Sequence, residues 1–573
     1  MCYNFSIMYS NDEVREVKSK YIELMEKALD AYSIEHIKRY FSDVKEYGLK
    51  EHGFPRLTAN IGILISHGRR TELLELFLEM MGFCCKNIPH VKAANDFSVR
   101  EIISCIFEIE KCAAIDAKTV NRWKAYLSEI EPTECYSIFA KKETDKVKNW
   151  ALFTAVSEFF REEIGLCNSR EFIDVQLASQ IQWLDENGMY MDGEGDNHQP
   201  IMYDLVPRGL FALLLNEGYR GKHYNEIDAC LKKSALLTLK MQSPNGEMAF
   251  GGRSNQFIHN EPWMAAVYEY EAKRYAAKGD TKLVREFKSA IKRALSVTEN
   301  WLSLKPVSHI KNRFPVETKY GCEEYAYFDK YMITVASNLY AAYLIADDAI
   351  PDYECSDIEP VVFETTEHFH KLFVKAGGYG LEFDLNADSH YDASGLGRIH
   401  KAGKHSAICL SVPCPKNPKY SVDIEKPCAL SFSPGVCDNS GEWTFATDTE
   451  SNYELVDSSC TCDSARVELC TRFKNGKNVV TEYEVSGNCV RIHVRGEGKV
   501  AYLLPAFLFD GESHTNIVCT GKEISISYKG DVCRYAVDGE ISTMPILAAN
   551  RNGHYKAYVA TGEEHLAITV QII

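Results

Sequence analysis

The amino-acid sequence predicts an α+β multidomain protein, with an N-terminal α/α toroid followed by a C-terminal antiparallel β-sandwich. Two observations predict this fold class. The chain has 573 residues, well beyond the roughly 250 to 300 at which a single core stops growing. Its apolar residues also change from helical spacing before about residue 350 to strand spacing after about residue 375. We therefore expect a toroid at 1–350, a crossover linker at 351–394 and a sandwich at 395–573.

The sequence of the N-terminal half predicts a succession of helical hairpins. Several amphipathic segments end at a glycine, as at Gly165, Gly218 and Gly279, and glycine commonly terminates a helix. No short internal repeat is visible, so a closed toroid with its long loops around a cleft is favoured over an open solenoid. The segments with helical spacing include 70–83, 99–114, 147–166, 205–218, 224–242, 261–279 and 329–348.

The sequence of the C-terminal half predicts an antiparallel β-sandwich. Its segments are short, rich in β-branched and aromatic residues, and separated by Gly, Asn, Asp or Pro. Examples are SARVELCTRF (464–473), NVVTEYEVSG (478–487) and CVRIHVRGEG (489–498). Many short strands with turn signals between them are typical of a β-sandwich.

The composition disfavours several classes of partner. A net charge of −17 disfavours nucleic acid, because the phosphate backbone needs clustered Lys and Arg. No stretch reaches the roughly 18 to 20 apolar residues that a membrane helix needs. No signal peptide is apparent, so we expect a cytoplasmic protein without a membrane partner. Whether it forms a homo-oligomer stays open.

The sequence also lacks the motifs of several cofactor-dependent and nucleophilic enzymes. We find no P-loop, no GxGxxG after a strand, no HExxH and no GxSxG. The 20 cysteines are spread along the chain without zinc-site spacing, so we expect reduced thiols. We predict no cofactor and no metal.

Candidate functional residues lie in four polar stretches, the first of which is the loop 187–204. Its glycines allow the backbone to bring polar groups to a common centre. An ordinary acidic, solvated loop is the alternative. The candidates here are Asp192, Asp196, Asn197, His198 and Tyr203.

The second stretch is the loop 250–263, which two glycines introduce. Its mixture of Arg, Asn, Gln and His is typical of a surface that binds hydroxyl and carboxylate groups. Helix capping would explain two of its members, an Asn and the following acid at a helix start. The candidates are Arg253, Asn255, His259, Asn260 and Glu261.

The third stretch, 316–332, interleaves aromatic rings with carboxylates, a combination that suits sugar binding. Its candidates are Glu324, Tyr325 and Tyr331. The alternative is a charged helix start with tyrosines at the rim. Asn149, which begins another predicted helix, is explained by cap chemistry.

The fourth stretch is the basic loop 395–406 at the entry to the sandwich. It contributes Arg398, His400 and His405. We expect it to face an acidic cleft and to close over an anionic substrate. An exposed interdomain turn is the alternative.

A resemblance to a known family rests on two motifs, MYMDGEGDNHQPIMYD (189–204) and KNWALFTAVSEFF (148–160). Together with the predicted architecture they resemble the heparinase II/III-like enzymes and a related bacterial β-glucuronidase family. In lyases of this kind, the resemblance implies, a Tyr and a His act as acid and base while an Asn or Arg neutralises the uronate carboxylate. Tyr203, His198 or His259, Asn197 and Arg253 match these roles by type and place. GRIHKAGKHS (397–406) departs from the HxH pattern expected of such lyases.

The sequence therefore predicts a carbohydrate-active enzyme on uronic-acid-containing oligosaccharides. Hydrolysis needs two carboxyl groups at the scissile bond, and the abundance of carboxylates favours hydrolysis. The resemblance implies a β-glucuronidase, and the expected cytoplasmic location favours an exo-acting enzyme on imported oligosaccharides. The alternative is a lyase that cleaves uronates by β-elimination with Tyr and His. A non-catalytic glycan-binding protein is the remaining hypothesis. For hydrolysis, the carboxylate candidates are Glu261 first, then Asp192, Asp196 and Glu324.

Overall fold

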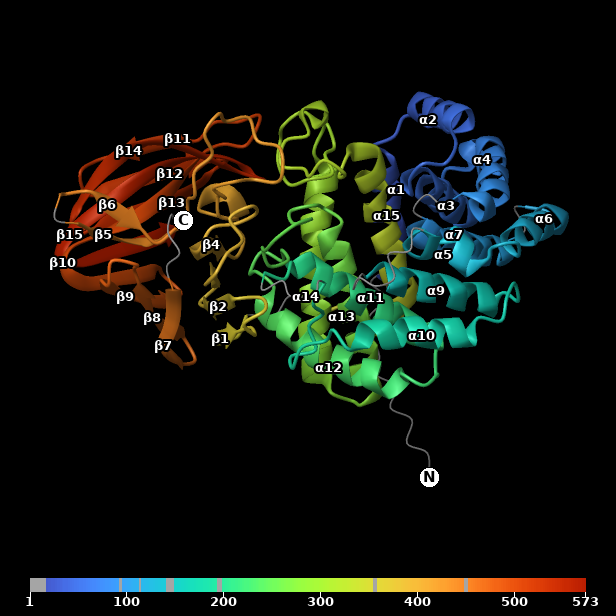
Figure 1. The fold of residues 1–573 in the computed structure, drawn as a ribbon, viewed down its shortest axis with the longest axis horizontal. Helices are drawn as coiled ribbons and strands as arrows, with labels where there is room; N and C mark the ends of the chain where they lie inside the picture. Colours follow the sequence, from blue (N-terminus) through green and yellow to red (C-terminus); the bar gives the residue numbers. More distant parts are fainter. Residues whose placement is uncertain are drawn as a thin grey trace, which may run out of the picture.

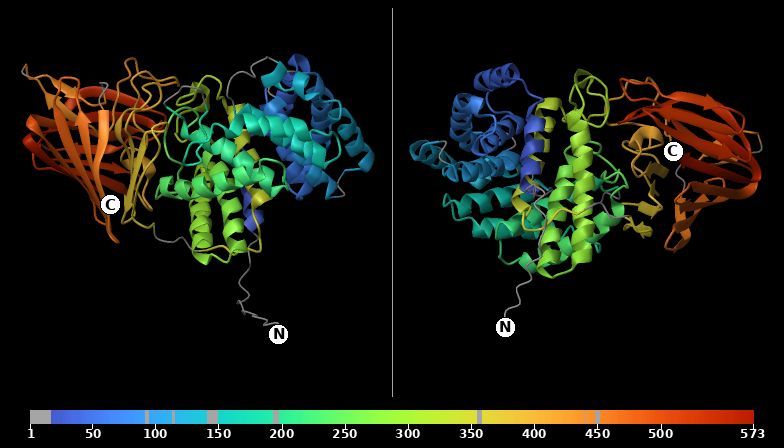
Figure 2. Two further views of the ribbon diagram at one scale, coloured as in Figure 1. Left: turned by 60° about the horizontal axis from the view of Figure 1, so that its bottom comes forward. Right: turned by 180° about the vertical axis from the view of Figure 1, so that it is seen from behind.

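The computed structural model describes residues 17–91, 95–112, 115–140, 149–192, 198–353, 358–438, 440–447 and 452–573. Within these ranges the chain divides into a helical half and a β half that lie side by side (Figures 1 and 2). The helical half ends with the helix Phe328–Ile345, and the β half begins with the strand Val361–Glu364. The predicted order of the two fold classes is confirmed.

Within the described part of the chain, six inner helices form a closed ring. They pack in the order α3, α5, α9, α11, α13 and α15, and α15 packs back on α3. These helices are buried around most of their circumference, as expected of helices enclosed by others. Their bounds are Gly53–Ser66, Asn95–Glu110, Trp150–Glu163, Ile201–Asn216, Asn260–Ala277 and Phe328–Ile345. The ring confirms the predicted toroid.

Most of the outer helices bury one side only. In α2, Ile37, Phe41 and Val44 are buried at positions i, i+4 and i+7, the spacing of one helical face. The longer outer helices are α1 (Val17–Leu29), α2 (Ile34–Tyr47), α4 (Leu74–Asn87), α6 (Ala117–Leu127), α10 (Arg170–Ile181), α12 (Tyr224–Met241) and α14 (Thr281–Ser303). Short helices are α7 (Pro132–Cys135), α8 (Ser137–Ala140), η1 (Thr71–Leu73), η2 (Ile88–His90), η3 (Val316–Thr318) and η4 (Ser406–Ile408). Among the described helices, none combines the length and apolar character required to cross a bilayer.

The described residues of the β half form two antiparallel sheets. The smaller has the order β1-β2-β3-β4, with bounds Val361–Glu364, Lys371–Ala376, Tyr379–Asp384 and Gly395–Lys401. The larger has the main path β11-β12-β13-β15-β10-β9-β8-β7, with β14, β5 and β6 attached. From β5 to β15 the bounds are Pro434–Cys437, Trp443–Phe445, Asn452–Cys460, Ser464–Arg472, Asn478–Ser486, Val490–Phe509, Asn516–Cys519, Glu523–Tyr528, Asp531–Val537, Glu540–Asn550 and Gly553–Ile572.

The small sheet forms the layer between the toroid and the large sheet (Figure 1). On β2, Leu372 and Val374 belong to the sandwich core, whereas Phe373 belongs to the toroid core. Lys375 Nζ donates to the carbonyl of Gln242 at the end of α12, at 2.6 Å. Both faces of this sheet are therefore covered.

The segment 351–394, expected as a crossover linker, contains three of these strands. The chain turns tightly between β2 and β3 at Gly377 and Gly378, whose φ angles are +54° and +80°. All six residues of β2 are buried, so KLFVKA lacks the polar alternation of a half-exposed strand. The β half accordingly begins before residue 395.

Candidate active site

A cavity of about 550 Å³ opens where the N-terminal ends of the six inner helices meet. Each helix contributes a lining residue from its first turns or from the position just before it. These residues are His52 and Arg56 (α3), Phe97 (α5), Asn149 and Trp150 (α9), Met202 and Tyr203 (α11), His259 (α13), and Lys330 and Tyr331 (α15).

This cavity favours an anionic ligand. The N-terminus of a helix carries partial positive charge and free N–H groups, which attract anions. Arg56, Arg253 and Lys330 line the cavity, and Asp192 is the single carboxylate among its described lining residues. The cavity is thus locally cationic, although the chain carries a net charge of −17.

Arg253 connects the cavity wall to Asp192 in the loop before α11. Its Nη2 lies 2.7 Å from Asp192 Oδ2, and its guanidinium lies 4.2 Å from the ring centroid of Tyr203. Asn149 Nδ2 donates to Asp192 Oδ1 at 2.9 Å. Burial raises the pKa of Asp192, against the opposing charge of Arg253. Asn149 occupies the N-cap position of α9, but its side chain forms no cap hydrogen bond, so the predicted capping by this side chain is wrong.

Three hydroxyl groups form a chain along the cavity. Tyr203 Oη lies 3.3 Å from Ser254 Oγ, which lies 3.0 Å from Tyr325 Oη. Desolvation in the cavity raises the pKa of Tyr325 well above its ordinary value, so this phenol stays protonated at neutral pH. The chain offers a path by which a proton can move between neighbouring oxygens.

His259 lines the same cavity as a neutral imidazole. Its ring lies between Phe257 and Tyr331, with centroid distances of 5.4 and 5.6 Å. Burial, together with the nearby positive charge of Arg56, lowers the pKa of His259 to about 3. Among the described residues, nothing forms a hydrogen bond with its Nδ1. The imidazole as a whole contributes to the lining of the cavity.

The structure adds cavity residues that the loops did not reveal. His52 is buried, and burial lowers its pKa well below the ordinary value. Arg56 donates from Nη1 to Thr334 Oγ1 at 3.0 Å and places Nε 2.9 Å from Glu101 Oε1. The sequence alone could have indicated Arg56, because it is the one charged residue of the apolar helix Gly53–Ser66. A charge in such a helix needs a partner or a function.

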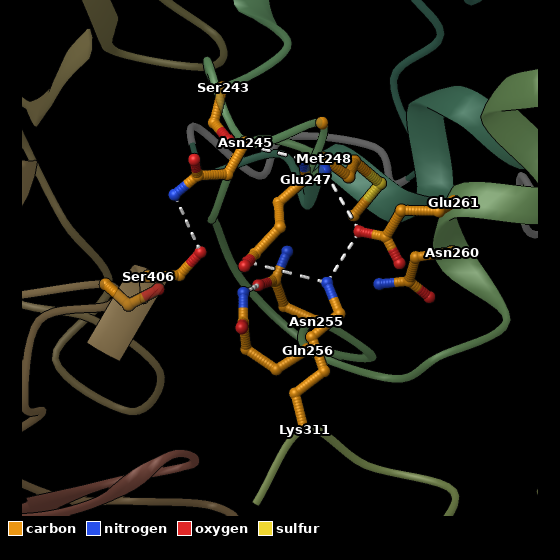
Figure 3. Close-up of polar contacts among 12 residues, drawn as sticks. Ser243, Asn245, Glu247, Met248, Asn255, Gln256, Asn260, Glu261, Lys311 and Ser406 are labelled. Carbon is orange, nitrogen blue, oxygen red and sulfur yellow. Dashed lines mark hydrogen bonds and ion pairs between the residues drawn. The ribbon is translucent and has the colours of Figure 1, made fainter. Parts of the chain in front are cut away.

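Glu261, the first predicted catalytic carboxylate, does not line the cavity. Its carboxylate is fully buried, with Lys311 Nζ 2.5 Å from Oε1 and the Met248 N–H donating to the same oxygen at 3.0 Å (Figure 3). Lys311 also lies 3.6 Å from Glu247. Glu261 therefore belongs to a buried ionic cluster, and its prediction as the leading acid is corrected.

Three other candidates of the toroid loops also lie outside the cavity. Asn255 Nδ2 donates to the Ala249 carbonyl at 3.1 Å, and Asn260 Nδ2 donates to the Ser254 carbonyl at 3.3 Å. Both amides stabilise the loop instead of facing a ligand. Glu324 is exposed on the surface.

The predicted basic loop of the sandwich does not reach the cavity. Arg398 is buried, 3.0 Å from Glu382, and donates to the Met248 carbonyl at 2.9 Å. His400 is buried with Nε2 2.9 Å from Ser411 Oγ. The ring of His405 packs on Tyr528 at 5.4 Å. These three residues make structural contacts, so their predicted role in substrate binding is corrected.

The remaining candidates of the stretch 187–204 are His198, Asp196 and Asn197. His198 lines a different cavity of about 830 Å³, with its ring 5.7 Å from that of His370. Asp196 and Asn197 lie outside the described residues. The structure thus brings together six of the predicted residues: Asp192, Tyr203, Arg253, His259, Tyr325 and Tyr331.

Comparisons with known proteins find similarity of fold. No protein-family model matches the sequence, and no curated protein does. A Streptomyces coelicolor A3 chondroitin AC lyase in complex with chondroitin sulphate is similar with a TM-score of 0.49 and 11% identity, over 99% of this chain and 80% of that one. A heparan sulfate lyase from Pedobacter heparinus has a TM-score of 0.34 and 9% identity, over 99% and 85% of the two chains.

Heparinase III is also similar, with a TM-score of 0.36 and 8% identity over 83% of this chain and 76% of that one. Heparinases and a chondroitin lyase are thus among the solved structures to which this chain is similar. Similarity at this level concerns the arrangement of helices and sheets, and it assigns no reaction.

Proposed function

We propose that the protein is a lyase that cleaves uronic-acid-containing oligosaccharides by β-elimination. One observation carries the proposal. The cavity places a guanidinium, a chain of phenol and serine hydroxyls and a neutral imidazole together, in Arg253, Tyr203, Ser254, Tyr325 and His259. These are the groups that β-elimination needs, namely a cation for the carboxylate, a base and an acid.

The reaction follows from these groups. The substrate carboxylate binds at Arg253, which also withdraws electron density from the carbon α to that carboxylate. His259 takes the proton from this carbon, a carbon–carbon double bond forms, and the bond to the leaving oxygen breaks. Tyr203 donates its proton to that oxygen and regains one from solvent through Ser254 and Tyr325, whose side chain is exposed. His259 releases the proton that it took to solvent, so both groups return to their starting forms. An anion bound beside His259 raises its pKa, so the bound substrate itself strengthens the base.

A glycoside hydrolase, the hypothesis favoured from the sequence, has less support. Hydrolysis needs two carboxyl groups on either side of the bond. Among the described residues lining the cavity, Asp192 is the single carboxylate, and Arg253 and Asn149 already bind it. Glu261 and Glu324 lie elsewhere.

The product distinguishes the two reactions. Elimination leaves an unsaturated uronate, whose conjugated double bond absorbs ultraviolet light, whereas hydrolysis releases reducing ends without this absorbance. We expect absorbance to rise in step with reducing ends. Tyr203→Phe should lower the rate about 100-fold or more, the usual contribution of a general acid or base.

Glu324→Gln is the matched control, because this exposed carboxylate lies outside the cavity. It should leave the elimination rate unchanged. Release of reducing ends without new absorbance would contradict the proposal, as would a Tyr203→Phe variant with full activity.

A further inference from the structure

We infer that the sandwich positions the reactive loop of the toroid, through Arg551 and Asn552 in the turn between β14 and β15. Both residues are buried. The loop in question is 250–263, which carries Arg253, Ser254 and His259. The catalytic meaning of this inference rests on the proposed function, whereas its structural part stands on the contacts alone.

The turn inserts into the toroid loops. Asn552 Nδ2 donates to the Lys311 carbonyl at 2.8 Å, and Asn312 Nδ2 donates to the Arg551 carbonyl at 2.8 Å. Gly553, with φ of +153°, permits the turn, since a Cβ there would lie 2.0 Å from the Phe509 carbonyl oxygen. The tip of this hairpin is thus enclosed by residues of the other half of the chain.

Arg551 holds a buried carboxylate at the loop. Its Nη2 donates to Glu323 Oε1 at 2.7 Å and its Nη1 to Glu323 Oε2 at 3.0 Å. The guanidinium also packs on the Tyr420 ring at 4.1 Å. This two-bond geometry fixes the carboxylate in direction as well as in position.

Glu323 in turn fixes the backbone of the reactive loop. Its Oε1 accepts the Ser254 N–H at 2.7 Å. Ser254 and Gln256 both have left-handed backbone, with φ of +58° and +64°. Residues other than glycine adopt this region at a cost, and they stay there when surrounding contacts enforce it.

The second left-handed residue is also held from the sandwich. Gln256 Oε1 accepts from Asn552 Nδ2 at 3.3 Å, and the Gln256 carbonyl accepts from the Lys311 N–H at 2.9 Å. Since Lys311 is itself bound by Asn552, the turn supports Gln256 both directly and through a neighbour. The strained loop is therefore enforced by the sandwich.

The held backbone sets the geometry of the reacting groups. Ser254 Oγ lies between the hydroxyls of Tyr203 and Tyr325, and Arg253 is its chain neighbour. Release of the Ser254 N–H would move the hydroxyl chain and the guanidinium together. Catalysis depends steeply on such placement, since an error of about 1 Å can cost on the order of 100-fold.

Arg551→Lys tests the inference, because it keeps the charge and loses the two-bond geometry. We expect kcat per folded molecule to fall about 10- to 100-fold, and KM to rise as well, because Arg253 moves with the loop. Hydrogen exchange should become faster in peptides that cover 250–257. The folded fraction is measured by circular dichroism, so a loss of stability alone is not counted as a loss of kcat.

Asn245→Ala is the matched control. Asn245 Nδ2 bridges the same two halves by donating to the Lys404 carbonyl at 3.0 Å and lying 3.1 Å from Ser406 Oγ (Figure 3). These contacts lie outside the reactive loop, so stability should fall without a change in kcat per folded molecule or in exchange at 250–257. Asn552→Ala serves as the second variant if Arg551→Lys does not fold, with the same two measurements.

Unchanged exchange at 250–257 in the tested variant would overturn the inference, and so would an unchanged kcat per folded molecule in an active enzyme. The exchange measurement needs no substrate. If the wild-type protein eliminates no uronate, the proposed function fails, and the exchange result still decides whether the sandwich holds the loop.

Discussion

Arg253 and Asp192 form an ion pair of 2.7 Å in the wall of the cavity, with Asn149 bound to the other carboxylate oxygen. Asp192 is the more enclosed partner, since its side chain is 5% exposed against 39% for Arg253. The carboxylate therefore orients the guanidinium, while part of the guanidinium remains available to a ligand. This relationship makes Asp192 a positioning residue instead of a general acid.

Asp192→Asn tests that assignment. The amide keeps the size and one acceptor oxygen but loses the charge that orients Arg253. We expect kcat/KM to fall about 10- to 100-fold, the value of one charge-assisted hydrogen bond. Steady-state kinetics on a uronate oligosaccharide measure it. A complete loss of turnover, which is expected if Asp192 is the catalytic acid of a glycosidase, would contradict the positioning role.

The pH dependence of kcat/KM reports the free enzyme, and His259 determines what we expect of it. The neutral imidazole is the active form, and burial lowers the pKa of His259 to about 3. Protonation therefore sets in only far below the ordinary histidine pKa of about 6.5. We expect kcat/KM to stay flat between about pH 5 and pH 7. An acid limb with a midpoint near pH 6.5 would show that a histidine with an ordinary pKa is used instead.

Asp392 gives a stability prediction at the contact between the halves. Its Oδ2 accepts the Gly252 N–H at 2.7 Å, and burial raises its pKa to about 6. A raised carboxyl pKa means that the folded state binds the proton more tightly than the unfolded state. This contribution is therefore complete below about pH 4 and is lost as pH rises through about 6.

Asp392→Asn should remove that pH dependence, because the amide has no proton to lose. Relative to the variant, the wild-type free energy of unfolding should decrease by on the order of 2 to 3 kcal/mol between pH 4 and pH 7. Urea unfolding of both proteins at the two pH values measures this difference. A constant difference across the range would show that Asp392 titrates normally.

The architecture could be predicted because the spacing of apolar residues along the chain distinguishes helices from strands. Helical spacing ends and strand spacing begins along the chain itself, so residues such as Ile37, Phe41 and Val44 indicate their shared face without tertiary information. Strand β2 could not be predicted from the spacing of its apolar residues. Both of its faces are covered, so its sequence does not alternate.

The site was predicted in part, and its gaps have one physical cause. Arg253, His259 and Tyr203 belong to the stretches 187–204 and 250–263, whose polar composition can be recognised from the sequence without knowledge of the fold. His52 and Arg56 meet them only because α15 closes the ring on α3, a contact that no local pattern encodes. Glu261 was misjudged in the same way, because its partner Lys311 lies 50 residues further along the chain.

Lys330 tests whether the cavity binds its ligand as an anion. The lysine lies in the first turn of α15, and its Nζ lies 5.7 and 5.8 Å from the ring centroids of Tyr327 and Tyr331. Burial lowers the pKa of Lys330, and a bound anion would favour its charged form. Lys330→Met should raise KM for a uronate oligosaccharide about tenfold, as expected for one lost charged hydrogen bond, while kcat changes little. Lys38→Met on the exposed face of α2 is the control and should leave KM unchanged.

Since salt screens such attraction, the wild-type KM should rise with ionic strength more steeply than that of Lys330→Met. Equal salt dependence in the two proteins would show that Lys330 does not contribute to the attraction of the substrate.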